Sequence, residues 1–159
     1  MDRNQKITLG VLALIVVLGG GVLTLSRRNK AVIKTNPVVT DTNSGAIKKT
    51  DAPKGQIITG FPKELILDPQ ASASESYTID YSKQNQYTVT LNSTMLPKDL
   101  FDTYKKYLVK NGYSIKNENN RSASLISIYA TSASADVNVV ATRDAGAVTT
   151  KLILTYLKH

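Results

Sequence analysis

The segment MLPKDLFDTYKKYLVKNGY, residues 95–113, predicts an amphipathic helix and thereby the class of the fold. Pro97 suits the first turn of a helix, where its missing N–H costs nothing, and Gly112 favours the left-handed conformation that ends a helix. Apolar residues recur between them at i, i+4 and i+8, so one side of the helix must pack against another element. These apolar residues are Leu100, Tyr104 and Leu108.

Upstream of this helix the polarity alternates from residue to residue, which is typical of β-strands. Residues 76–94 predict a β-hairpin whose turn lies at residues 83–85. Six apolar side chains are expected on one face of this hairpin: Tyr77, Ile79, Tyr81, Tyr87, Val89 and Leu91.

Downstream of the helix, four short segments that are apolar or alternating are separated by turn-prone sequence. They are residues 113–116, 123–131, 135–143 and 148–157. Strands joined by short turns pair antiparallel, and one helix can cover one face of a sheet. We therefore expect an α+β fold: one amphipathic helix packed on an antiparallel sheet of five to six strands, in the order β-β-α-β-β-β-β, preceded by a single transmembrane helix.

The composition divides the chain of 159 residues into four parts. Residues 1–6 form a short basic tail, and residues 7–25 are apolar. Residues 26–60 are rich in Thr, Asn and Lys and are interrupted by Pro and Gly, so we expect a flexible basic tether there. Residues 61–159 are the expected α+β domain.

Residues 7–25 carry no charged side chain and would form a helix about 28 Å long, enough to cross a bilayer. Because no polar face is present, we expect a membrane anchor rather than a buried core helix. The alternative is a signal peptide cleaved near residues 19–21, but apolar sequence continues beyond them without an Ala-x-Ala site. The expected anchor side chains are Ile7, Leu9, Val11, Leu12, Leu14, Ile15, Val16, Val17, Leu18, Val22, Leu23 and Leu25.

Three cations, Arg27, Arg28 and Lys30, follow the apolar segment and are expected to face lipid head groups. A simple positive-inside count would keep the carboxyl side in the cytoplasm. However, a short basic start before an apolar segment resembles an export signal, and long domains translocate with little regard to charge. We therefore expect a single-pass protein of a bacterial cytoplasmic membrane with an extracytoplasmic C-terminal domain.

The net charge of +8 is concentrated in the first sixty residues, which hold nine basic and three acidic side chains. The remaining residues hold eleven basic and nine acidic side chains, so a nucleic-acid-binding face is not implied. There is no cysteine, and the one histidine is His159, so thiol, zinc and Ser/His sites are excluded. We expect no cofactor, no metal and no catalytic residue. Three carboxylates remain as candidates for a hydrolase, although a solvated role is favoured for each: Asp80, Asp136 and Asp144.

A possible interaction surface combines lysines of the helix with nearby tyrosines: Lys105, Lys106, Tyr107, Lys110, Tyr113 and Tyr129. Aromatic rings beside cations can stack on glycans or on single-stranded nucleic acid. The simpler interpretation is a solvated helix face with scattered amphipathic rings, and this interpretation is favoured.

A resemblance covers residues 61–159. The motifs that carry it are a Phe-Pro lead-in and a helix with an Asn-Gly-aromatic exit: Phe61, Pro62, Pro69, Ala71, Tyr104, Leu108, Asn111, Gly112 and Tyr113. This region resembles a family of small, largely uncharacterised, membrane-anchored bacterial envelope domains. The resemblance implies a ββαβββ(β) unit and a place in the envelope, and it implies no catalytic residue.

Three functions follow as hypotheses. The preferred one is a non-enzymatic anchored domain that binds another envelope component, either a protein or a glycan. The second is a nucleic-acid or surface-attachment factor that uses the basic tether and the Tyr/Lys helix face. The third is a carboxylate-dependent hydrolase. The oligomeric state stays open.

Overall fold

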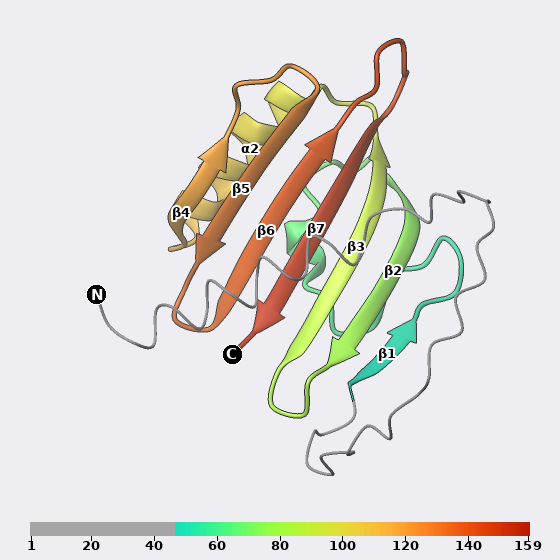
Figure 1. The fold of residues 1–159 in the computed structure, drawn as a ribbon, viewed down its shortest axis with the longest axis vertical. Coiled ribbons are helices and arrows are strands. Elements are labelled where there is room, and N and C mark those ends of the chain that lie inside the picture. The colour runs from blue at the N-terminus through green and yellow to red at the C-terminus, as the bar shows by residue number, and fades with distance from the viewer. Residues whose placement is uncertain (1–46) are drawn as a thin grey trace, which may run out of the picture. The chain divides into compact units, whose positions relative to one another are not determined.

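The structure is a computed structural model that describes residues 47–159. This part of the chain contains one α-helix, one short 3₁₀-helix and seven strands (Figure 1). In chain order the elements are β1 (Lys48–Asp51), η1 (Lys63–Leu65), β2 (Ser72–Asp80), β3 (Asn85–Ser93), α2 (Pro97–Lys110), β4 (Ser114–Asn119), β5 (Leu125–Thr131), β6 (Ala135–Thr142) and β7 (Thr150–Lys158).

The seven strands form one antiparallel sheet in the order β1-β2-β3-β7-β6-β5-β4. Strands β4 to β7 follow one another as a meander, and β7 then pairs with β3. The last strand of the chain therefore lies in the centre of the sheet (Figure 1). This pairing places Tyr87 of β3 directly opposite Tyr156 of β7.

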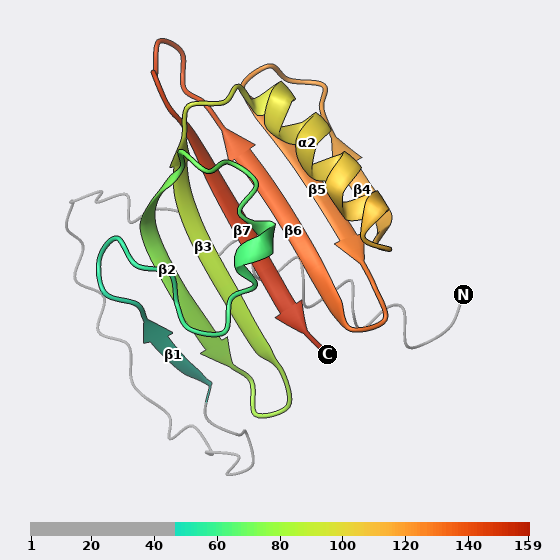
Figure 2. The ribbon, with the colours of Figure 1, turned by 180° about the vertical axis from the view of Figure 1, so that it is seen from behind.

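Two segments together cover one face of the sheet (Figure 2). Helix α2 packs on β4, β5 and β6. The segment between β1 and β2, which contains η1, lies over β3 and β7 beside the helix (Figure 2). Phe61 and Leu65 of this segment are buried in the core, and Ile66 and Leu67 pack against it. This segment between β1 and β2, which we call the lead-in, therefore covers the part of the sheet face that helix α2 does not cover (Figure 2).

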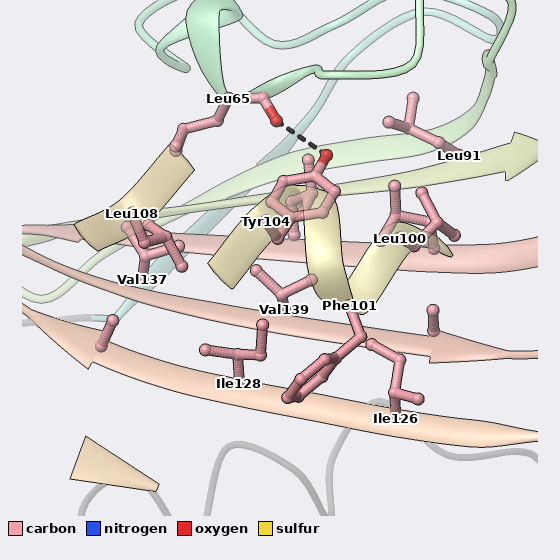
Figure 3. Close-up of a cluster of buried hydrophobic side chains, with 14 of the residues drawn as sticks. Leu65, Leu91, Leu100, Phe101, Tyr104, Leu108, Ile126, Ile128, Val137 and Val139 are labelled. Carbon is pink, nitrogen blue, oxygen red and sulfur yellow. Dashed lines mark hydrogen bonds between the residues drawn. The ribbon is translucent and has the colours of Figure 1, made fainter. Parts of the chain in front are cut away.

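The hydrophobic core lies between the sheet and this covering layer (Figure 3). The apolar side of α2 contributes Leu100, Tyr104 and Leu108, all fully buried. Alternate residues of the central strands face them, because successive side chains of a strand point to opposite faces. The strand residues of the core are Val89, Leu91, Ile126, Ile128, Ala130, Val137, Val139, Ala141, Leu152 and Leu154. All core residues come from residues 61–154, so the described part of the chain holds a complete core of its own.

The expected number of strands, five to six, is wrong, because the sheet has seven. The additional strand is β1, which lies in the segment predicted as tether. Its sequence, KKTD, has no apolar alternation and all four side chains are exposed. Its position depends on pairing with β2, and the N–H of Ala52 extends this pairing by donating to the carbonyl oxygen of Ser76 at 2.8 Å. The predicted element order must therefore be corrected to β-β-β-α-β-β-β-β, and the folded region begins before residue 61.

The predicted face of β2 is also wrong, whereas Val89 and Leu91 of β3 face the core as expected. Thr78, not Tyr77, lies opposite Tyr87, so Tyr77 and Ile79 point away from the helix. The reason is the turn: Asp80 pairs with Asn85, which leaves four residues between the strands, and the N–H of Tyr81 donates to the carbonyl oxygen of Gln84. A shift of register by one residue moves every side chain of a strand to the other face.

The expected anchor at residues 7–25, the basic residues Arg27, Arg28 and Lys30, and most of the expected tether lie outside the described residues. Within residues 47–159, no helix is both long and apolar enough to cross a bilayer.

Candidate functional site

The structure separates the side chains of the predicted Tyr/Lys surface. Tyr107 and Tyr113 are partly buried and pack against the core on the helix side of the sheet. Tyr129 lies in β5 beside the buried Ala130, and therefore on the opposite face. Its hydroxyl donates a hydrogen bond of 3.0 Å to Asp136 Oδ2. Tyr129 consequently belongs to a different surface from the other two tyrosines.

Of the three lysines of the predicted surface, Lys105 alone has an ionic partner among the described residues. Lys105 forms an ion pair of 2.8 Å with Glu118 of β4, and its ammonium lies 5.6 Å from the centre of the Phe101 ring. Lys106 and Lys110 are exposed on the helix. The side of α2 that carries Lys105 thus faces the β4 edge and is already neutralised there.

Two tyrosines that the sequence did not single out join Tyr107 and Tyr113. Tyr87 and Tyr156 lie directly opposite each other on β3 and β7, with ring centres 6.3 Å apart and planes tilted by 42°. Burial is the main cause that raises the pKa of Tyr113 and of Tyr156; Tyr107 adds to the effect on Tyr113, and Tyr113 adds to the effect on Tyr156. We call Tyr87, Tyr107, Tyr113 and Tyr156 the tyrosine cluster. The strand alternation predicted that Tyr87 lies on an apolar strand face, but no local signal predicted that β3 and β7 are neighbours.

The helix terminus positions two members of the cluster. Gly112 has φ +80°, and the N–H of Tyr113 then donates to the carbonyl oxygen of Leu108 at 2.9 Å. This is the left-handed ending that returns the chain toward the helix. Asn111 Nδ2 donates to the carbonyl oxygen of Tyr107 at 2.8 Å, so the last turn is closed by a side chain as well. Tyr107 and Tyr113 are therefore held by one compact cap.

The lead-in segment positions a third member. Gly60 has φ +96°, and a Cβ atom at this residue would lie 2.8 Å from Tyr87 Cε1. The backbone of the lead-in therefore runs directly against the Tyr87 ring. Only glycine combines this close approach with a positive φ at low cost.

The carboxylate of Glu64, in η1, acts electrostatically on three tyrosines of the cluster. Burial is the main cause that raises the pKa of Tyr107, Tyr113 and Tyr156, and the negative charge of Glu64 adds to the effect on all three. A nearby Ser132 acts in the opposite direction on the pKa of Tyr113. The three phenols are consequently protonated at neutral pH, because their ordinary pKa is already about 10. Glu64 itself is exposed.

A second polar group lies on the other face of the sheet. Buried Asp136 accepts the hydrogen bond from Tyr129, and its Oδ1 lies 3.3 Å from Nε2 of His159. Burial, followed by the hydrogen bond to Asp136 and the charge of Asp136, raises the pKa of Tyr129 to about 12.

The structure does not bring the three candidate carboxylates together as a catalytic pair. Asp80 Oδ1 accepts the N–H of Ser82 in the β2–β3 turn. Asp136 is the second residue of β6, whereas Asp144 follows the other end of this strand. Among residues 47–159, no three acidic or histidine side chains converge in a way that could hold a metal ion. A shallow polar pocket on the β4–β5 hairpin is lined by Asn117, Glu118, Asn119, Arg121 and Ser122.

Comparison of the chain with protein-family models, with curated proteins and with solved structures finds no match. The geometry of the described residues is therefore the basis for a functional proposal.

Proposed function

We propose that this chain is a non-enzymatic, single-pass envelope protein whose domain binds another envelope component, either a protein or a glycan. The observation that carries the proposal is the tyrosine cluster. Its rings come from α2, β3, β7 and the helix exit, so elements far apart in the sequence converge on one aromatic surface. Tyrosine offers a large contact area with a polar edge, and such side chains are enriched at binding surfaces.

The envelope placement is supported by the sequence. The apolar segment at residues 7–25 has the length of a membrane anchor, and residues 61–159 resemble anchored envelope domains. The chain enters the described domain at the short edge strand β1, away from the tyrosine cluster on β3, β7 and α2. Anchoring would raise the local concentration of the domain near membrane partners.

The nucleic-acid alternative loses support from the positions of its expected residues. Lys105 is paired with Glu118, and Tyr129 lies on the opposite face of the sheet. A partner protein or a glycan is the better match to the tyrosine cluster.

Site-specific photo-crosslinking in intact bacterial cells tests the proposal. A photoreactive phenylalanine analogue would replace Tyr107 in one variant and Tyr129 in a matched control, in the full chain with a tag after His159. We expect a discrete crosslinked product from position 107 and none from position 129. Protease added to intact cells or spheroplasts should remove the tag. Equal products from both positions, or a tag protected until lysis, would contradict the proposal.

A further inference from the structure

The face of the sheet opposite α2 and the lead-in is left open by every helix and strand of residues 47–159 (Figure 1). One row of side chains crosses this face at right angles to the strands, because residues paired in register point to the same side. The row takes one residue from each of β2, β3, β7, β6 and β5: Tyr77, Thr88, Thr155, Asn138 and Tyr129. We call these five residues the polar row, since each side chain carries a hydroxyl or an amide group.

A tyrosine stands at each end of the polar row. Neighbouring strands lie about 4.8 Å apart, so the four spacings from Tyr77 to Tyr129 span about 19 Å. Both rings are partly exposed. Lys49 Nζ lies 4.3 Å from the centre of the Tyr77 ring, and the Tyr129 hydroxyl donates to Asp136 Oδ2 at 3.0 Å. Both rings are therefore held in place by their neighbours.

The middle of the row offers hydrogen-bonding groups that the domain itself does not use. Thr155 and Asn138 are partly exposed, and neither side chain has a hydrogen-bond partner within residues 47–159. Gln86 lies on the same face of β3 and donates from Nε2 to Thr88 Oγ1 at 3.3 Å. Its Oε1 is buried without a partner in the described part of the chain. Buried acceptors are normally paired, so this face lacks a donor that an occupant can bring.

The centre of this face carries almost no free charge. Within two residues of the polar row along β3, β5, β6 and β7, Asp136 is the only charged residue. Its two oxygens are occupied by the Tyr129 hydroxyl and by His159 Nε2. At the β1 edge, Lys49 and Asp51 neutralise each other at 2.7 Å. The row is therefore a neutral, hydrogen-bonding surface.

We propose that the polar row binds a neutral, extended, β-linked glycan chain that lies across the strands. A sugar ring has C–H faces that pack on aromatic rings, and its edges carry hydroxyl groups that pair with side-chain hydroxyls and amides. Tyr77 and Tyr129 supply the rings, and Thr155 and Asn138 supply the polar groups between them. This site lies on the face opposite the tyrosine cluster and does not depend on it.

The chemistry of the row disfavours other occupants. A nucleic acid needs free cations, whereas Lys49, the lysine that contacts the row, is paired with Asp51. An apolar helix or a lipid surface would bury the Thr155 hydroxyl and the Asn138 amide without partners. A chain of neutral sugars satisfies these groups and leaves no charge unpaired.

Titration of residues 47–159, which hold a complete core, tests the inference. Chitohexaose is the probe, and its binding would be followed by isothermal titration calorimetry and by backbone amide signals in NMR. Maltohexaose, which is neutral but coiled, and a dodecameric oligothymidylate are the comparisons. We expect chitohexaose alone to bind, with shifts centred on Asn138 and Thr155. Its affinity should be equal at low and high salt, because no charge takes part.

Matched variants decide whether the binding depends on the polar row. Thr155→Val keeps the branched shape without the hydroxyl and should weaken chitohexaose binding about three- to tenfold, the loss expected for one hydrogen bond. Thr142→Val is the control, because Thr142 lies on the same face of β6 but about 14 Å along the strand from Asn138. Tyr77→Leu should also weaken binding, whereas Tyr107→Leu, in the tyrosine cluster, should not.

No binding of chitohexaose, or equal effects of Thr155→Val and Thr142→Val, would overturn the inference. Loss of binding in Tyr107→Leu alone would overturn it as well, and would place the glycan at the tyrosine cluster in support of the proposed function. Tighter binding of the oligothymidylate that falls steeply with salt would replace the glycan by nucleic acid.

The crosslinking experiment stays independent of this test. Position 129 is still expected to give no product, because its replacement removes the Tyr129 phenol from the polar row. Failure of position 107 to crosslink would refute the tyrosine cluster as a binding site and leave the polar row untouched.

Discussion

The hydroxyl of Tyr104 joins helix α2 to a segment 39 residues earlier in the chain. It donates a hydrogen bond to the carbonyl oxygen of Leu65 at 2.8 Å, and the Tyr104 hydroxyl oxygen in turn accepts the N–H of Leu67 at 3.5 Å. Figure 3 shows this bond above the apolar side of the helix. The two segments cover different strands of one sheet face, so this contact closes the layer over the core.

Tyr104→Phe should destabilise the domain by about 1–3 kcal/mol, because the variant keeps the ring but leaves a buried carbonyl group without its donor. Urea denaturation followed by circular dichroism would measure the change. Tyr107→Phe is the control, because the Tyr107 hydroxyl has no hydrogen-bond partner in the described structure. An equal loss in both variants would show that the Tyr104 contact has no special role.

The stability of the domain should fall at high pH in a way that depends on Tyr129. Its pKa is raised to about 12 in the folded state, against about 10 in an unfolded chain. Between these values the unfolded state loses its proton first, so the contribution is fully present below pH 10 and is lost as the pH rises toward 12. Denaturation at a series of alkaline pH values should show a shallower decline for Tyr129→Phe. An identical decline in both proteins would contradict this assignment.

Gly60→Ala should weaken ligand binding at the tyrosine cluster, because its Cβ would lie 2.8 Å from Tyr87 Cε1 and displace the ring. Gly55→Ala is the matched control: Gly55 also has a positive φ, but no atom lies within 4 Å of the added Cβ. Each substitution should cost about 1–2 kcal/mol, because alanine resists the left-handed conformation. Only Gly60→Ala should alter the crosslinking of position 107 in intact cells. Similar binding by both variants would show that Tyr87 is not part of the site.

Replacement of residues 48–51 by a Gly-Ser repeat should promote self-association. Strand β1 covers the outer edge of β2, and an uncovered edge presents unpaired N–H and C=O groups to other chains. Analytical ultracentrifugation over a range of concentrations would detect the change. The control is Lys98→Ala, which breaks an exposed ion pair on the helix and should leave the domain unchanged. A monomeric Gly-Ser variant would show that β1 does not protect the sheet.

The elements that depend on local sequence were predicted more closely than those that depend on pairing. Helix α2 begins at Pro97 and ends at Lys110, within the segment that its apolar spacing and its end signals indicated. The faces of β2 could not be derived in the same way, because they depend on the number of residues in the turn. Strand β1 had no signal at all, since four exposed polar residues form a strand only when a neighbouring edge is available.

The candidate site shows the same division. The sequence groups Tyr107 and Tyr113 because both have lysines nearby in the chain, and the structure places both at the end of α2. Tyr129 was grouped with them by type alone, and the alternation of β5 places it on the other face.

The sequence by itself determined the helix, the apolar alternation of the central strands and the exclusion of thiol and zinc chemistry, because each depends on residue type and local spacing. Only the tertiary structure decided that β7 returns to pair with β3, and that the lead-in lies beside α2. These contacts join residues far apart in the chain, and they form because one helix leaves half of a sheet face uncovered. The packing of Tyr87, Tyr107, Tyr113 and Tyr156 against one core follows from these contacts rather than from any local pattern.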